Sequence, residues 1–384
     1  GKDRAAILLG GREVDGAYWY DDEIGGYVTS DYYSEPEWLE SFDDRRLLDV
    51  RFGEVWEPLP LKPESIEELQ LEKPDFGPLH RQLPITFGPP RPAPDESFYH
   101  ALRDSPWWDR YLAQFARFVV EAEDLGGDTY PDLLALGFSA PDYVGHDHGP
   151  HSREYVDTLL RLDQTIGELL EYLDERVGLE NMIIGLTADH GVVPVPEVRR
   201  RQGLPGTRVS SETVSCLQNV GRQLAERHGV ESWLEPGPRL APNLMELTGR
   251  SRDELEQETA ALLEQCPAVE AVWTSSDLAR EVDEEDHFRW LYANSYYPQR
   301  SADFLIQFEK YFMASVSSVT THGSPYAYDT RVPMIIMAPG LAPETLETPT
   351  RTVDLAPTLA RLLGIPIPDE VDGRVLIEPA ASSP

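Results

Sequence analysis

The chain has 384 residues, more than a single hydrophobic core usually fills, so we expect one large domain with an insertion or two domains. Its formal net charge of −35 argues against binding to a nucleic-acid backbone or an anionic membrane, because both would repel it. An anionic substrate must therefore meet a local cluster of positive charge.

No apolar run approaches the roughly 18 residues that a membrane-spanning helix needs, so we expect no membrane span. The chain contains two cysteines, Cys216 and Cys266, and their spacing leaves open whether they pair and whether the compartment is oxidising. The sequence begins at Gly1 and enters apolar sequence at once, so we expect a processed or truncated product.

Short apolar runs bounded by turn residues are typical of strands buried on both faces. Such runs occupy 131–139, 181–188 and 331–339. Between the first two, apolar residues recur at helical spacing over 152–178, which makes a strand–helix–strand unit. Another helix is predicted over 353–364, with Asp354 as its N-cap and Gly364 at its C-terminal end. The pattern predicts an α/β fold with a mostly parallel central sheet flanked by helices.

The segment 195–300 differs in character from the rest of the chain. It contains an arginine-rich turn, an acidic run, a helical pattern over 251–266 and a strand-like run over 269–274. We interpret 195–300 as an inserted smaller α+β subdomain. The catalytic α/β core would then comprise 1–194 and 301–384.

Side chains of the kind that bind metals follow the predicted strands. In parallel sheets ligands bind beyond the carboxyl ends of the strands, where loops converge. Asp142 and His146 follow the first predicted strand, and their spacing of four places them on one side of a helical turn. An aspartate and a histidine in this arrangement can share one cation.

Two further segments contain candidate ligands. Asp189 and His190 follow the second predicted strand, and Gly191 permits a sharp turn that could aim both at a second ion. His322 lies just before the third predicted strand, in a loop that could fold back to the same edge. Carboxylate and imidazole ligands without cysteine favour zinc over manganese or iron.

Each of these residues alone has a simpler explanation. A lone histidine in a loop flanked by glycine and proline is usually a surface residue, and only the joint occurrence at strand ends indicates a metal site. His148 lies two residues past His146 and is a candidate for substrate contact, with a solvated loop as the alternative. His151 opens the following helix in this interpretation.

Three blocks of the sequence resemble the metal-binding blocks of the alkaline phosphatase superfamily, in their usual order. They are "SAPDYVGHDHGPHSREYVDTLLRLDQTIGELL", "LTADHGVVP" and "THGSPYAYDTRVP". The nearest group is that of the bacterial zinc alkaline phosphatases, nucleotide pyrophosphatases and phosphodiesterases with a threonine nucleophile. Further similarity in "KDRAAILLGGREVDGAYWYD" and "TVDLAPTLARLLGIPIPDEVDGRVL" extends the resemblance over nearly the whole chain.

The resemblance implies an alkaline-phosphatase-like fold and two zinc ions, Zn²⁺, as cofactors. Asp142, His146 and His322 match the ligands of one zinc ion. Asp189 and His190 match two ligands of the other.

The resemblance also implies a phosphate-binding role for Lys2 and Arg4. They match a pair that holds the phosphate oxygens in the monoesterase branch, and alternate residues of an extended segment would point the same way. The alternative is a frayed basic end of the chain. The family's zinc-binding aspartate and threonine nucleophile precede the "KDRAAIL" block, and no later threonine lies in a comparable block. This chain therefore contains no predicted nucleophile, and we expect it to be a fragment or to work with a separate upstream piece.

In function, the resemblance implies an enzyme, a zinc-dependent phosphatase that hydrolyses small-molecule phosphate monoesters. One alternative is a phosphodiesterase or nucleotide pyrophosphatase with the same metal site. An alternative of another class is a non-catalytic metal-binding fragment that lacks the nucleophile. The resemblance places the protein in the periplasm or outside the cell, and the sequence leaves its physiological substrate and oligomeric state open.

Overall fold

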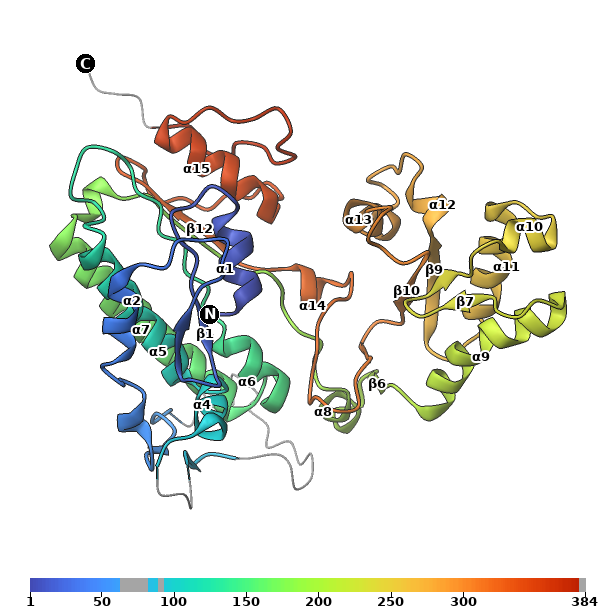
Figure 1. Ribbon diagram of the computed structural model, residues 1–384, viewed down its shortest axis with the longest axis horizontal. Helices are drawn as coiled ribbons and strands as arrows, with labels where there is room; N and C mark the ends of the chain where they lie inside the picture. The colour runs from blue at the N-terminus through green and yellow to red at the C-terminus, as the bar shows by residue number, and fades with distance from the viewer. Residues whose placement is uncertain (63–81, 89–92, 380–384) are drawn as a thin grey trace. The chain divides into compact units, whose positions relative to one another are not determined.

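A computed structural model describes residues 1–62, 82–88 and 93–379 (Figure 1). The chain forms two compact units: the first comprises Gly1–Asp189 and Val332–Pro384, and the second comprises His190–Arg331. The predicted subdomain, 195–300, lies within the second unit, and its independence as a folding domain stays a prediction. None of the described helices has the length and apolar character needed to cross a membrane.

Helices of the first unit pack around a core rich in aromatic side chains, which includes Trp56, Phe98 and Phe115. The helices are α1 (Asp3–Gly10), α2 (Glu37–Asp43), α4 (Glu96–Arg103), α5 (Pro106–Ala122), α6 (Ala140–His148), α7 (Arg153–Arg176) and α15 (Leu355–Leu363), with short 3₁₀ turns at Asp49–Arg51, Leu179–Asn181 and Thr352–Asp354. The long helix α7 agrees with the helix predicted over 152–178. Helix α15 follows Asp354, but the side chain of Asp354 makes no capping hydrogen bond to it, whereas Gly364 ends the helix in the left-handed conformation, as expected for a C-terminal glycine.

The described strands of the first unit form antiparallel pairs. They are β1 (Trp19–Asp21) with β2 (Gly26–Val28), β3 (Val55–Trp56) with β4 (Ile85–Thr86), and β5 (Ile184–Thr187) with β12 (Met334–Met337). Two predicted strands are thus present but shorter than expected, and 131–139 has no strand assignment.

The predicted parallel pairing is not seen in the first unit's described residues. Parallel neighbouring strands are usually joined by a right-handed crossover connection. The connection between β5 and β12 is instead the whole second unit, and so long a connection allows either strand direction. The pairing of Met334 with Thr187 and of Met337 with Ile184 shows that β12 returns antiparallel to β5.

The second unit has a core of its own, which includes Leu224, Trp233, Leu255 and Phe304. Its helices are α8 (Pro196–Arg201), α9 (Ser211–His228), α10 (Leu244–Thr248), α11 (Arg252–Leu263), α12 (Ser275–Leu278), α13 (His287–Ser295) and α14 (Ala327–Thr330). Its strands are β6 (Thr207–Arg208), β7 (Leu234–Glu235), β8 (Arg239–Leu240), β9 (Val269–Thr274), β10 (Phe304–Phe308) and β11 (Phe312–Met313). Strand β9 coincides with the predicted 269–274 and pairs antiparallel with β10, while α11 confirms the predicted helix.

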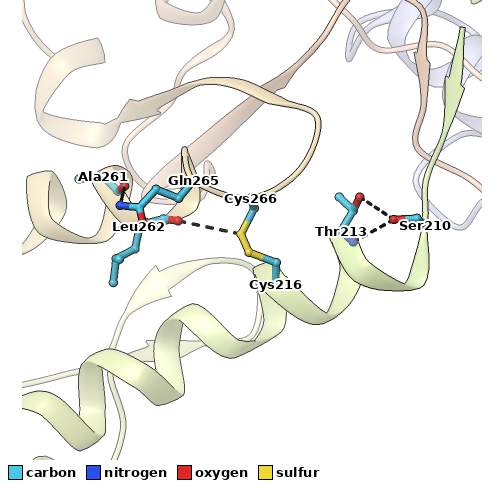
Figure 2. The surroundings of a disulfide bond; sticks show 7 residues. All are labelled: Ser210, Thr213, Cys216, Ala261, Leu262, Gln265 and Cys266. Carbon is cyan, nitrogen blue, oxygen red and sulfur yellow. Dashed lines mark hydrogen bonds between the residues drawn. A yellow bond between two sulfur atoms is a disulfide. The ribbon is translucent and has the colours of Figure 1, made fainter.

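A disulfide joins Cys216 of α9 to Cys266, which follows α11 (Figure 2). The two Cα atoms lie 5.6 Å apart, within the usual range for a disulfide. At the start of α9, Ser210 caps the helix by accepting a hydrogen bond of 3.1 Å from the backbone N–H of Thr213. The pairing that the sequence left open is therefore present, and it links the two helices that cover the core of the second unit.

Replacing Cys216 and Cys266 together with serine is expected to lower the free energy of unfolding by about 4 kcal/mol, because the disulfide closes a long loop in the unfolded chain. Urea denaturation followed by far-ultraviolet circular dichroism measures the change. Wild-type protein treated with dithiothreitol is the control and should match the serine variant. A midpoint that dithiothreitol does not move would contradict the prediction.

Candidate functional site

Helix α6 presents Asp142 and His146 on one side, one turn apart. Oδ1 of Asp142 lies 3.3 Å from Nε2 of His146, and both side chains are largely shielded from solvent. A carboxylate oxygen and an imidazole nitrogen at this separation form a donor pair that fits a zinc ion. The helical spacing in the sequence thus predicts the local geometry correctly.

Lys2 approaches Asp142 from the start of the chain. Its ammonium group forms an ion pair with Oδ2 of Asp142 and lies 4.8 Å from the ring centre of Tyr143. Burial would raise the pKa of the Asp142 carboxyl, but hydrogen bonds with His146 and Lys2 outweigh that effect and hold the pKa far below its ordinary value. Asp142 is therefore ionised at neutral pH, the state in which a carboxylate binds a metal.

The prediction of an extended segment around Lys2 and Arg4 is wrong. Helix α1 begins at Asp3, and Lys2 is its N-cap residue, because the run "AAILL" consists of residues that favour a helix at this position. Lys2 and Arg4 are therefore not alternate residues of a strand. Both residues nevertheless line the same pocket of the first unit.

This pocket has a volume of about 240 Å³. It is lined by the cations Lys2, Arg4 and Arg103, the aromatic residues Trp19, Tyr20, Trp108 and Tyr143, and by Gly1, Asp3, Asp21 and Asp22. Nη1 of Arg103 donates a hydrogen bond of 2.7 Å to Asp22, and the guanidinium lies 4.4 Å from the ring centre of Tyr143. Arg103 was not predicted, because it lies on α4, outside every motif block.

His148 occupies a different environment from His146. Its side chain is buried, with Nδ1 3.9 Å from Oε2 of Glu154 and its ring centre 6.5 Å from that of Trp56. His148 is not among the residues that line the pocket containing Lys2. These contacts indicate a packing role, and a contact with substrate stays a prediction.

In the second unit, the rings of His190 and His322 are stacked, with centres 3.4 Å apart and planes inclined by 12°. Nδ1 of His190 donates a hydrogen bond of 2.9 Å to the carbonyl of Gly191, so Nε2 is the ring nitrogen that could bind a metal. Backbone hydrogen bonds from Gly191 to Asp329 and from Val193 to Thr321 hold the two segments together. Two predicted ligands, distant in the sequence, therefore lie in contact.

Asp189 and Asp329 flank these histidines in the chain. Asp189 is exposed and follows β5 at the end of the first unit. Asp329 is 3% exposed and accepts a hydrogen bond of 2.7 Å from the backbone N–H of Ser324. Burial raises the pKa of the Asp329 carboxyl, although the hydrogen bonds from Ser324 oppose the shift. Sequence reasoning missed Asp329, because an aspartate in a turn-rich segment is usually exposed.

Residues 4–324 match the model of the type I phosphodiesterase and nucleotide pyrophosphatase family. The chain belongs to this family. Alkaline phosphatase PhoV of Synechococcus elongatus is 29% identical, and the match covers 98% of this chain and 68% of that protein. Alkaline phosphatase PhoK of a Sphingomonas species is 30% identical, with 98% of this chain and 67% of that protein covered.

A crystal structure of the wild-type alkaline phosphatase PafA matches 98% of this chain and 72% of its own, with a TM-score of 0.83 and 25% identity. The predicted alkaline-phosphatase-like α/β fold is therefore confirmed. The prediction of an enzyme that hydrolyses phosphoric esters is confirmed at the level of the family. The relatives' greater length means that this chain spans about two thirds of PhoV and PhoK.

Replacing Gly191 with alanine is expected to lower the free energy of unfolding by about 1–3 kcal/mol, the usual cost of forcing extra volume into a packed site. The added Cβ would lie 2.1 Å from the backbone carbonyl oxygen of Tyr328, which cannot move without disturbing the turn. Thermal unfolding measures the effect. The matched control is Gly167→Ala in α7, where the Cβ meets nothing within 4 Å and the change should stabilise the helix. Equal melting temperatures for wild type and Gly191→Ala would contradict the prediction.

Proposed function

We propose that the protein hydrolyses small-molecule phosphate monoesters at a metal site that includes Asp142 and His146. The observation that carries this proposal is the contact of Lys2 with Asp142, beside His146 and at the border of the pocket lined by Arg4 and Arg103. Cationic side chains and a metal ion can both stabilise the negative charge of a phosphate monoester dianion. The named relatives, alkaline phosphatases, support the same reaction.

The proposed cofactors are two zinc ions, with manganese or iron as alternatives. Asp142, His146 and His322 would bind one ion, and Asp189 and His190 would bind the other. The donors fit zinc, because both cysteines are taken up in the disulfide and only carboxylates and imidazoles are offered. A bound zinc ion supplies a Lewis acid that stabilises negative charge and lowers the pKa of a coordinated hydroxyl.

The side chains of this chain then have distinct roles. Lys2 and Arg4 are proposed to hold the phosphate oxygens, and the low pKa of Asp142 keeps its carboxylate available across the neutral and alkaline range. The attacking group is proposed to be a threonine from a segment upstream of this sequence, as the resemblance implies. His148 is the candidate for a direct contact with substrate, and its ring would have to become accessible for that contact because it is buried.

A phosphodiesterase is the second candidate, and the family description favours it. A diester carries one negative charge fewer than a monoester dianion, so it has less use for a pocket with three cations. Asp3, Asp21 and Asp22 line the same pocket, so its charge alone does not distinguish the two esters, and the relative turnover of the two esters decides between them. A metal-binding protein without turnover is the candidate of another class, and it predicts zinc binding with neither ester hydrolysed.

The compartment and the partners follow from charge and the disulfide. We propose the periplasm or the cell exterior, because a disulfide persists in an oxidising environment. The net charge of −35 disfavours a nucleic-acid backbone as substrate. The proposed partner is a small phosphate ester.

Replacing His146 with alanine is expected to weaken zinc binding by more than about 100-fold. Losing a residue that only supports a ligand costs up to about 100-fold, and His146 is proposed to bind the ion directly. Competition with a chromophoric chelator measures the affinity. His151→Ala, at an exposed histidine of the same segment, is the control and should bind zinc like the wild type. Unchanged zinc affinity in His146→Ala would refute the proposed site.

Replacing Lys2 with alanine is expected to lower kcat/KM for an aryl phosphate by about 100-fold, the usual cost of losing one charge-stabilising donor. The loss for the matching methyl aryl diester should be much smaller. Steady-state turnover of both substrates by the complete protein measures the ratio. Equal losses on both esters would show that Lys2 does not recognise the monoester charge, and a strong diester preference in the wild type would favour the second candidate.

A further inference from the structure

The start of helix α6, which presents Asp142 and His146, lacks a local cap. Its N-cap residue, Ser139, has a helical backbone conformation, and its side chain makes no capping hydrogen bond. Both Ser139 and Ala140 are buried, so their N–H groups are shielded from most water. Buried N–H groups at a helix start are costly unless another group accepts their hydrogen bonds.

Asp109 of the neighbouring helix α5 supplies the missing acceptor. Its Oδ1 accepts hydrogen bonds from the N–H of Ser139 at 3.0 Å and from the N–H of Ala140 at 3.2 Å. One carboxylate oxygen thus receives both donors at the start of α6. The cap comes from a residue about thirty positions earlier in the chain, which ties α6 to α5 at this point.

Burying the Asp109 carboxylate is energetically unfavourable. It is 2% exposed, and among the residues that the structure describes its Oδ2 has no hydrogen-bond partner. Burial raises its pKa to about 7, although the N–H groups of Ala140 and Ser139 oppose the shift. A polar group in such a position is stabilised mainly by the two hydrogen bonds that it accepts.

The residue before Asp109 contacts the same turn of α6. The rings of Trp108 and Tyr143 meet edge to face with centres 5.4 Å apart. Asp142 lies between Ala140, held by Asp109, and Tyr143, held by Trp108. Two adjacent residues of α5 therefore restrict both the position and the rotation of the turn that presents Asp142.

We propose that Asp109 is a positioning residue for the metal site, which sets the orientation of Asp142 by capping α6 from α5. This inference rests on the proposed function, because it takes Asp142 as a metal ligand. Asp109 itself touches neither metal nor substrate in this proposal. It acts through the backbone of Ser139 and Ala140.

The test compares Asp109→Leu with Asp109→Asn in the full chain. The leucine has the same branched skeleton without either oxygen acceptor, and it is expected to weaken zinc binding by about 10–100-fold, as the loss of other supporting partners does. The asparagine keeps a carbonyl acceptor, resembles the neutral carboxyl, and should restore zinc affinity close to wild type. Chelator competition measures the affinity, and urea denaturation corrects it for the folded fraction.

The matched control is Asp157→Leu. Asp157 is also fully buried and accepts hydrogen bonds from Trp56 at 2.7 Å and from the N–H of Leu59 at 2.6 Å, so its hydrogen bonds lie elsewhere than at the start of α6. This variant should lower stability and leave the zinc affinity of the folded protein unchanged. Should Asp109→Leu not fold, Asp109→Ala is measured in the same way against Asp157→Ala.

The possible outcomes separate the two proposals. Weaker zinc binding in Asp109→Leu, recovery in Asp109→Asn and no change in Asp157→Leu support the positioning role. Wild-type zinc affinity in Asp109→Leu, or equal losses in the Asp109 and Asp157 variants, overturns it. If His146→Ala also binds zinc normally, the metal site itself is wrong, whereas a loss in His146→Ala alone overturns only the inference on Asp109.

Discussion

The candidate site depends on the ionised carboxylate of Asp142. One oxygen meets the ammonium of Lys2, and the other lies 3.3 Å from His146. A part-buried carboxylate keeps its charge only where donors and cations compensate for lost water, and here those groups overcome the effect of burial. The same charge would suit Asp142 to the proposed role of a metal ligand, and it holds the ammonium group of Lys2 beside it.

Strong acidity of the whole chain makes the local arrangement of cations decisive. A net charge of −35 repels anions at long range, so a phosphate ester is attracted only where basic side chains gather. Lys2, Arg4 and Arg103 gather at one pocket, and Asp22 holds the guanidinium of Arg103 in place. In the proposed function, these three side chains would recognise the charge of the substrate.

In the second unit, backbone hydrogen bonds determine where His190 and His322 lie. Hydrogen bonds from Gly191 and Val193 to the segment around 321–329 bring the rings of His190 and His322 into stacking contact. Gly191 is needed there because the carbonyl of Tyr328 occupies the space of any Cβ. The unit has its own core and a disulfide between α9 and the end of α11, and these loops belong to the same unit.

Local patterns in the sequence determined much of this protein. Helical patterns predict α7, α11 and α15, a strand-like run predicts β9, and the spacing of Asp142 and His146 places both on one side of a turn. These features depend on neighbours within a few residues, which is why they can be read from the chain. The motif blocks also identified the superfamily.

Contacts between distant segments were decided by the tertiary structure alone. The contact of Lys2 with Asp142, the cap of α6 by Asp109, the place of Arg103 in the pocket and the pairing of the cysteines have no local pattern. The same holds for the antiparallel return of β12, because the long connection through the second unit does not restrict strand direction. Sequence periodicity shows on which side of a helix or strand a residue lies. Only the packing of the folded chain determines which other residues that side contacts.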